Sequence, residues 1–161
     1  MDLTTARELL HAATRCDEVP EVRAVFITGS GSAFSTGGDV RDFSSAGEDL
    51  PSLLKNPTTH LHAAVSRLVR APVIAAVNGV AAGGLSLVLA SDLVFAAESA
   101  SFHYAYSRIG LSPDGSSTYF LPRLLGMRRA LEFALMGRAL SARGAHEWGL
   151  VNRVVTDSEL T

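Results

Sequence analysis

The chain has 161 residues, of which 47% are hydrophobic and 19% charged, and its formal net charge is −2. This length suffices for one domain with a buried core, and the composition excludes a disordered chain. The 14 basic residues are scattered, which argues against a nucleic-acid-binding face. The single cysteine, Cys16, excludes an internal disulfide and favours a reducing compartment.

Apolar periodicity and turn residues predict alternating helices and strands along the chain. The expected elements are a helix over 3–16, a strand over 22–28, a loop over 29–39, the start of a short helix over 40–43, a surface loop or poorly ordered helix over 44–58, a helix over 61–69, a strand over 73–77, a helix over 84–90, a strand over 93–97, an extended run over 100–104, a turn over 110–115, helices over 116–125 and 128–136, a short helix from 141 to Gly149, and a strand over 151–155. This alternation predicts an α/β fold with a buried sheet.

Residues 71–91 carry no charge and are long enough to imitate a membrane-spanning helix. They contain Pro72, the pair Asn78-Gly79 and the pair Gly83-Gly84, which interrupt a helix. A buried strand, a turn and a helix therefore explain this segment better than a membrane span.

Two glycine-rich turns each follow an apolar strand and precede an expected helix. The first is STGGD at 35–39, and the second is NGVAAGG at 78–84. Glycine lets a backbone turn tightly and approach a ligand, and a helix N-terminus supplies unpaired N–H groups. Two such turns side by side can direct two amides at one oxygen, as in an oxyanion hole. Taken singly, each turn is also explained as a tight connection in a packed sheet.

Four blocks resemble the crotonase, or enoyl-CoA hydratase/isomerase, superfamily. They are VRAVFITGSGSAFSTGGDV (22–40), PVIAAVNGVAAGGLSLVLASD (72–92), IGLSPDGSSTYFLPRLLG (109–126) and WGLVNRV (148–154). The resemblance covers nearly the whole chain. It implies a ββα spiral core forming a single, partial acyl-CoA-binding domain over residues 1–161, without the family's N-terminal strands and its C-terminal helical trimerisation segment.

The resemblance also implies that both turns donate amides to the thioester carbonyl of an acyl-CoA. Gly38 matches the first donor. The second is Gly83 or Gly84, because the segment from Asn78 to Asp92 is one residue shorter than the family pattern. The implied substrate contacts are Ala33, Phe34, Ser35, Gly37, Asp39, Val40, Arg41 and Tyr106.

Hydratases of the family carry two glutamates, and this chain has Ser86 (or Leu87) and Tyr106 at the matching positions. Neither serine nor tyrosine is a carboxylate base near neutral pH, so hydration is disfavoured. Asp114 matches the acidic base of several isomerases. A carboxylate there would move an allylic proton while the oxyanion hole holds the dienolate. The other interpretation of Asp114 is a turn or helix-capping residue.

The expected walls of the acyl pocket are aromatic, from Phe102, Tyr104, Tyr106, Tyr119 and Phe120. A second hypothesis makes Asp114 a nucleophile, as in the family's aryl-CoA dehalogenases. Those enzymes need a histidine base, and His60 or His62 falls near its position, although a solvated helix residue is the commoner explanation.

The sequence therefore predicts an enoyl-CoA isomerase that moves a double bond from 3-enoyl-CoA to 2-enoyl-CoA. The alternative is a catalytically silent crotonase-fold protein that only binds acyl-CoA or a partner. The resemblance implies no cofactor or metal beyond the coenzyme A thioester used as substrate, and no nucleic-acid or membrane partner. It also implies a homo-oligomer, a trimer or hexamer, and the expected location is the cytoplasm.

Overall fold

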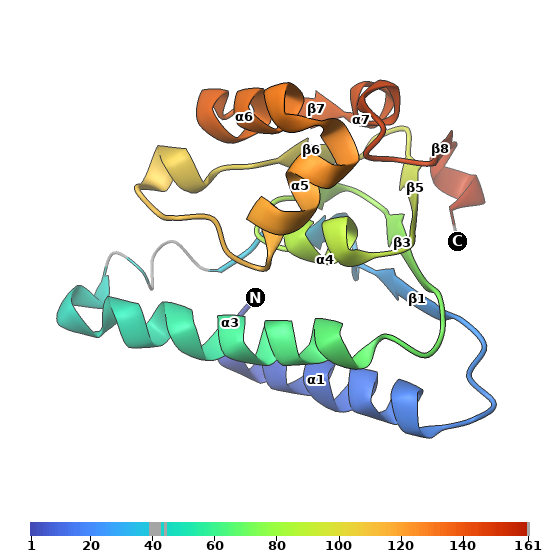
Figure 1. Cartoon of the computed structure of the whole chain (residues 1–161), viewed down its shortest axis with the longest axis horizontal. Coiled ribbons are helices and arrows are strands. Elements are labelled where there is room, and N and C mark those ends of the chain that lie inside the picture. Colours follow the sequence, from blue (N-terminus) through green and yellow to red (C-terminus); the bar gives the residue numbers. More distant parts are fainter. Residues whose placement is uncertain (39–42, 44, 161) are drawn as a thin grey trace.

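The first six strands alternate between two sheets, the seventh stays in the second sheet, and the eighth returns to the first (Figure 1). The computed structural model describes residues 1–38, 43 and 45–160. The elements in chain order are α1 (Leu3–Glu18), β1 (Val25–Thr28), β2 (Ala33–Ser35), η1 (Gly47–Asp49), α3 (Leu50–Arg67), β3 (Val73–Val77), β4 (Val80–Ala81), α4 (Leu85–Ala90), β5 (Leu93–Ala97), β6 (Ser101–His103), η2 (Tyr106–Ile109), α5 (Ser117–Leu125), α6 (Met127–Met136), β7 (Ala139–Ser141), α7 (Ala142–Trp148), β8 (Arg153–Val155) and η3 (Asp157–Glu159).

The first sheet has the order β1-β3-β5-β8, and its three strand pairs are all parallel. The second has the order β2-β4-β6-β7, with only β7 antiparallel to its neighbour. Each step from β1 to β2, from β3 to β4 and from β5 to β6 crosses between the sheets. This is the α/β spiral that the sequence predicts.

Burial explains why these short strands form. Side chains of β3 alternate between buried and half-buried, and Ala75 and Val77 are fully enclosed. The helix α4 that follows is buried on all sides from Leu85 to Leu89, so its near-continuous apolar sequence reflects a central position in the core. No helix in the described part of the chain is long and apolar enough to cross a membrane.

Of the two expectations over 44–58, a surface loop or a poorly ordered helix, the loop is wrong from residue 50 on, because α3 is continuous from Leu50 to Arg67 and contains Pro57. Helix α3 packs along α1 on one side of the sheets (Figure 1). Leu61 and Ala64 are buried in this packing. Tertiary burial of its apolar face outweighs the local cost of a proline in the helix interior.

Three short strands were not expected from the sequence: β2 and β4, which lie inside the predicted glycine loops, and β7. They have two or three residues each, too few for an alternating apolar and polar pattern to be recognised in the sequence. The expected strand over 73–77, the strand over 93–97 and the helices near 116–125 and 128–136 are confirmed, with shifts of a residue at some boundaries. The expected helix start over 40–43 falls mostly outside the described residues.

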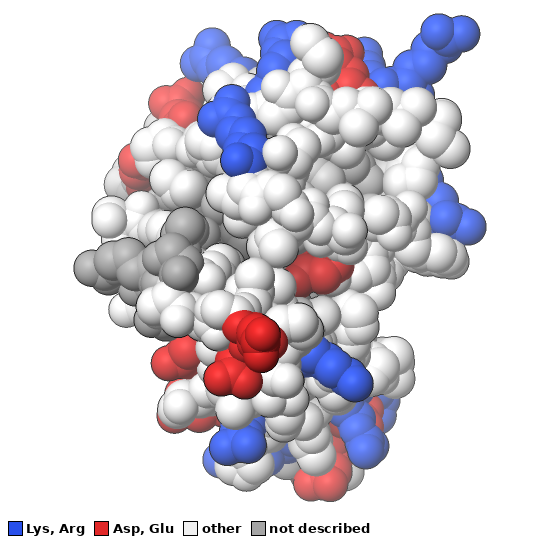
Figure 2. Space-filling model, turned by 90° about the vertical axis from the view of Figure 1, so that its left-hand side faces the viewer, with Lys and Arg blue, Asp and Glu red and all other residues white. Residues whose placement is uncertain are grey.

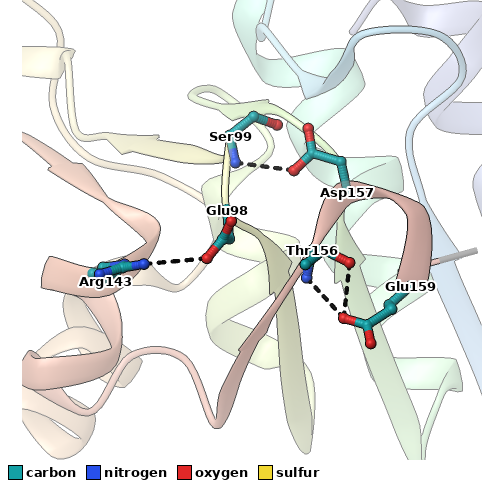
Figure 3. Close-up of polar contacts among 6 residues, drawn as sticks. All are labelled: Glu98, Ser99, Arg143, Thr156, Asp157 and Glu159. Atoms are coloured by element: carbon teal, nitrogen blue, oxygen red, sulfur yellow. Dashed lines mark hydrogen bonds and ion pairs between the residues drawn. The ribbon is translucent and has the colours of Figure 1, made fainter.

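Polar contacts fix the last described turn of the chain to the end of β5 (Figure 3). The Asp157 carboxylate accepts a hydrogen bond from the Ser99 N–H at 3.2 Å, which lowers the pKa of Asp157. Glu159 accepts from the hydroxyl and N–H of Thr156 at 2.8 and 3.1 Å. On the face seen in Figure 2, charges of both signs are interspersed and no basic patch dominates.

Candidate active site

The two glycine turns lie directly against each other. The Ala82 N–H donates to the Ser35 carbonyl at 2.8 Å, which extends the pairing of β2 and β4 into the turns. Gly37 has a φ of +98°, and a Cβ on Gly83 would lie 2.3 Å from the Gly37 Cα. Both positions therefore need glycine, Gly37 for its backbone conformation and Gly83 for the close approach. The structure brings together the two turns that the sequence predicts to be neighbours.

The side chain of Asn78 joins the loops that lead into these turns. Its Oδ1 accepts from the Gly29 N–H at 3.1 Å, and its Nδ2 donates to the carbonyls of Gly29 and Gly31 at 3.1 and 2.9 Å. One amide side chain thereby satisfies backbone groups that the strand pairing leaves open.

A cavity of about 940 Å³ opens beside the turns. Its walls come from the starts of α1 and α3, the two glycine turns and the segment after β6. Among the described residues the lining is Met1, Asp2, Leu3, Thr5, Thr36, Gly37, Gly38, Phe43, Leu53, Leu54, Asn56, Pro57, Thr58, Leu61, Ala82, Gly83, Ala105, Tyr106, Ile109, Leu111 and Asp114. This volume is in the usual range for a small-molecule site.

The expectation of an aromatic wall is correct only for Tyr106. Phe102 and Tyr104 are buried in the core, Tyr119 is 54% exposed, and Phe120 packs against the core from outside. The walls are instead largely aliphatic, and Leu53, Leu54, Pro57 and Leu61 of α3 contribute to them. The aliphatic residues of α3 reach the cavity because the chain is helical from Leu50 on, in a segment for which a surface loop was one of the two expectations.

Asp114 contributes its carboxylate to the cavity wall. Its Oδ1 accepts a hydrogen bond from the Tyr106 hydroxyl at 2.5 Å, and its Oδ2 accepts from the Thr58 hydroxyl at 3.2 Å. The two donors come from different elements, η2 and α3. Within residues 1–38, 43 and 45–160, the carboxylate is thus oriented by neutral hydroxyl groups, and no basic side chain is bonded to it.

Tyr106 is suited to remain a donor in this arrangement. Burial, together with the hydrogen bond to Asp114, holds the pKa of the Tyr106 phenol far above its usual range. The phenol therefore keeps its proton at neutral and moderately alkaline pH, and it can donate to Asp114 throughout that range.

The backbone of Asp114 is held from the opposite side. The Ser117 hydroxyl donates to the Asp114 carbonyl at 2.6 Å and lies 2.9 Å from the Tyr104 hydroxyl. The N-cap residue of α5 is Ser116, whose side chain makes no capping hydrogen bond. Among the described residues, the Asp114 carboxylate bonds Tyr106 and Thr58 and does not cap the helix. Its carbonyl also accepts the Ser117 N–H at 3.0 Å, so Asp114 is a turn residue, as one of the two simpler interpretations has it.

Gly38 and Gly83 both line the cavity, whereas Gly84 is the N-cap residue of α4 and packs against Ser35. A Cβ on Gly84 would lie 2.4 Å from the Ser35 Cβ. The N–H groups of Gly83 and Gly84 have no backbone acceptor in the part of the chain that the structure describes. By position, Gly83 is the better candidate for the second amide donor.

Six of the predicted substrate contacts are not among the described residues of the cavity lining. Ala33, Phe34 and Ser35 form β2, and Phe34 is a core residue. None of the three is among the described residues that line the cavity. Asp39, Val40 and Arg41 lie outside the described residues.

The positions of the hydratase glutamates are occupied by groups unsuited to that role. Ser86 and Leu87 are buried in α4 and do not belong to the described cavity lining. Gly115 covers Ser86 so closely that a Cβ on Gly115 would lie 2.2 Å from the Ser86 Cβ. A glutamate side chain at 86 would compete for space with the backbone next to Asp114.

Neither histidine considered as a base reaches the cavity lining in the described structure. His60 Nδ1 lies 2.8 Å from the Asn56 carbonyl, so the ring N–H donates along its own helix, and His62 is exposed. No group of three or more His, Cys, Asp or Glu side chains that could hold a metal ion occurs among the described residues.

Much of the cavity lining was not predicted from the sequence, including Thr58 and Phe43. Thr58 lies 56 positions before Asp114, in a segment expected to be a surface loop or a poorly ordered helix. Phe43 lies against Gly38, where a Cβ would come within 2.4 Å of the ring. No local pattern marks either residue, because each reaches the site only through the tertiary fold.

The spiral of two sheets, with a cavity beside two paired glycine turns, defines the chain as an α/β protein. The family model described as enoyl-CoA hydratase/isomerase matches residues 1–161. The chain belongs to this family and has the crotonase fold.

Named relatives show how the chain compares with longer proteins. It is 38% identical to a 4-chlorobenzoyl coenzyme A dehalogenase of an Arthrobacter species, over 94% of this chain and 56% of the relative. It is 43% identical to the 1,2-epoxyphenylacetyl-CoA isomerase of Escherichia coli K12, over 86% of this chain and 55% of the relative. The crystal structure of an enoyl-CoA hydratase from Bacillus anthracis superposes with a TM-score of 0.90 at 34% identity, covering 99% of this chain and 62% of that structure. The chain thus spans little more than half the length of the dehalogenase and of the epoxyphenylacetyl-CoA isomerase.

Proposed function

We propose that the protein is an acyl-CoA isomerase that converts 3-enoyl-CoA to 2-enoyl-CoA with Asp114 as the base. The observation that carries this proposal is the carboxylate of Asp114, which faces the same cavity as Gly38 and Gly83 and is oriented by two hydroxyl groups. The relative named as an isomerase, at 43% identity, also supports it.

In this reaction Asp114 removes a proton from C2 of the 3-enoyl thioester. The electron pair moves into the carbonyl, and the amides of Gly38 and Gly83 stabilise the resulting dienolate oxygen. The same proton then returns to C4, so that the double bond lies between C2 and C3 and the carboxylate is regenerated. Gly84 remains the alternative second donor. The substrate contacts proposed around the thioester are Ala33, Phe34, Ser35, Gly37, Asp39, Val40, Arg41 and Tyr106.

The direct test replaces Asp114 by asparagine, which keeps the shape of the side chain and removes its basicity. We expect isomerisation of 3-enoyl-CoA to fall by about 10²–10⁴-fold, with binding of a non-reactive acyl-CoA analogue retained. The matched control is Asp49→Asn at an exposed position that makes no side-chain cap. Isomerisation by Asp114→Asn at the unaltered rate would refute the role of Asp114.

The second candidate function is acyl-CoA binding without turnover, in which the glycine turns and the cavity hold the ligand and Asp114 transfers no proton. Calorimetric binding of the analogue without isomerisation by the unaltered chain would establish it. Release of halide from 4-chlorobenzoyl-CoA would instead point to Asp114 as a nucleophile, the chemistry in the name of the Arthrobacter relative.

We further propose that the reaction needs no cofactor or metal, that the protein assembles as a homo-oligomer and that it acts in the cytoplasm. Light scattering of the purified protein tests whether it is a homo-oligomer. Turnover after exhaustive chelation tests whether the reaction needs a metal.

A further inference from the structure

The hydroxyl of Thr58 lies between two acceptors on opposite sides. It is 3.2 Å from Asp114 Oδ2 and 2.9 Å from the carbonyl oxygen of Leu54 in the preceding turn of α3. A hydroxyl has one proton and two lone pairs, so it can donate to only one of these oxygens at a time while it accepts from another group. Thr58 can therefore exchange its donor role at Asp114 for an acceptor role.

The other carboxylate oxygen has no such freedom. Asp114 Oδ1 accepts the 2.5 Å hydrogen bond from Tyr106, and the Tyr106 hydroxyl is half-enclosed next to the core. A phenol that retains its proton remains a donor, so Oδ1 is the poorer place for a second proton. A proton taken up by Asp114 is thus best accommodated on Oδ2, the oxygen that faces Thr58.

We propose that Thr58 is a positioning residue that directs the transferred proton to Oδ2 of Asp114 and holds it there. While Asp114 is ionised, the Thr58 hydroxyl donates to Oδ2. When Oδ2 has taken the proton from C2 of the substrate, the Thr58 hydroxyl turns to the Leu54 carbonyl and accepts the new Asp114 O–H. When the proton leaves for C4, the first arrangement is restored and no proton is gained or lost.

This inference rests on the proposed function, because it takes Asp114 to be the base. It also gives helix α3 two roles, since the same helix lines the cavity and bonds Asp114. Thr58 shares α3 with the cavity-lining side chains Leu54, Pro57 and Leu61. An acyl group lying against this helix would contact the element that orients the carboxylate.

The test compares Thr58→Val, which keeps the shape and removes the hydroxyl, with Thr58→Ser, which keeps the hydroxyl. In D₂O the label at C4 of the 2-enoyl product reports how often the abstracted proton exchanges with solvent before it returns. We expect Thr58→Val to lower kcat about tenfold with KM within about twofold, since a hydrogen bond to a charged group is lost. We also expect it to raise deuterium at C4 severalfold, and Thr58→Ser to restore both values to within about threefold.

Two results would overturn the proposal. One is a Thr58→Val protein, folded by circular dichroism, whose kcat and deuterium content match the unaltered chain. The other is a Thr58→Ser protein as impaired as Thr58→Val, because that pattern indicates a packing role for the methyl group.

Failure of the proposed function gives a different result, which is full isomerisation by Asp114→Asn or none by the unaltered chain. An inactive Asp114→Asn beside a normal Thr58→Val would refute the role of Thr58 alone.

The carboxylate resonance of Asp114 provides a readout that does not depend on turnover. In protein labelled with ¹³C at aspartate side chains, the Asp114 signal is identified by its absence from Asp114→Asn. We expect this signal to move in Thr58→Val and to return toward its original position in Thr58→Ser. An unmoved signal in Thr58→Val would show that no hydrogen bond joins the two residues, and would overturn the proposal.

Discussion

At the residue scale, the contact between Gly83 and Gly37 decides whether the two turns can share one cavity. The backbones meet so closely that a single added carbon on Gly83 would lie 2.3 Å from the Gly37 Cα. Neither backbone can move away easily, because the Ala82 N–H is bonded to Ser35 just before the turn. The close contact of the two turns thus depends on residue 83 being glycine, which has no Cβ.

We expect Gly83→Ala to separate the turns and to lower isomerisation by about 10²-fold, the usual effect of losing one oxyanion donor. The clash should also lower the free energy of unfolding by about 1–3 kcal/mol. Steady-state kinetics and urea unfolding measure the two effects.

Gly144→Ala in α7 is the control, because a Cβ there would meet its nearest neighbour at an ordinary 3.4 Å. A helix interior favours alanine over glycine, so this variant should be unchanged or slightly more stable. Turnover by Gly83→Ala equal to that of Gly144→Ala would contradict the role of the close contact.

At the element scale, the C-terminal end of α1 is held by a side chain from outside the helix. The last carbonyls of a helix lack intrahelical partners. Arg70, between α3 and β3, donates to the carbonyls of Cys16 and Asp17 at 3.2 and 2.8 Å and also to those of Val19 and Pro20. This arginine therefore joins the two helices on whose starts the cavity is built.

We expect Arg70→Met to lower the free energy of unfolding by about 1–2 kcal/mol, since charge-assisted hydrogen bonds at an exposed site are replaced by water. Arg67→Met, at the exposed end of α3, keeps the same change in charge and should have less than half that effect. Urea unfolding of both variants is the measurement, and equal destabilisation would indicate a simple charge effect.

At the scale of the whole molecule, Phe133 of α6 packs between Trp148 of α7 and Tyr104, which follows β6. It is fully buried, and its ring centroid lies 5.8 Å from that of Tyr104 and 6.4 Å from that of Trp148. Tyr104 in turn bonds Ser117, which holds the backbone of Asp114. Core packing and the position of the proposed base are therefore linked through one aromatic cluster.

We expect Phe133→Ala to lower the free energy of unfolding by about 3–5 kcal/mol, the usual range for truncating a buried phenylalanine. Trp148, the one tryptophan of the chain, is a fluorescent reporter of this unfolding. Leu131→Ala on the same helix is the control, because Leu131 is 50% exposed and should lose at most about 1 kcal/mol. Similar losses in the two variants would show that the aromatic cluster is not a stability centre.

The sequence alone determined much of this protein because some signals are local. The apolar runs at β3 and β5 and the two glycine-rich turns at 35–39 and 78–84 have patterns within a few residues, and the structure confirms the two strands and the contact between the turns. The family resemblance, also local in its motifs, is confirmed over the full chain.

Only the tertiary structure decided the rest, because it depends on contacts between distant residues. Helix α3 continues through Pro57 because its apolar face is buried against α1, a gain that no local pattern records. The same packing brings Thr58 to Asp114 across 56 positions and replaces the expected aromatic wall with an aliphatic one. Likewise, the preference for Gly83 over Gly84 follows from which glycine faces the cavity and which packs on Ser35, a distinction set by the approach of two backbones.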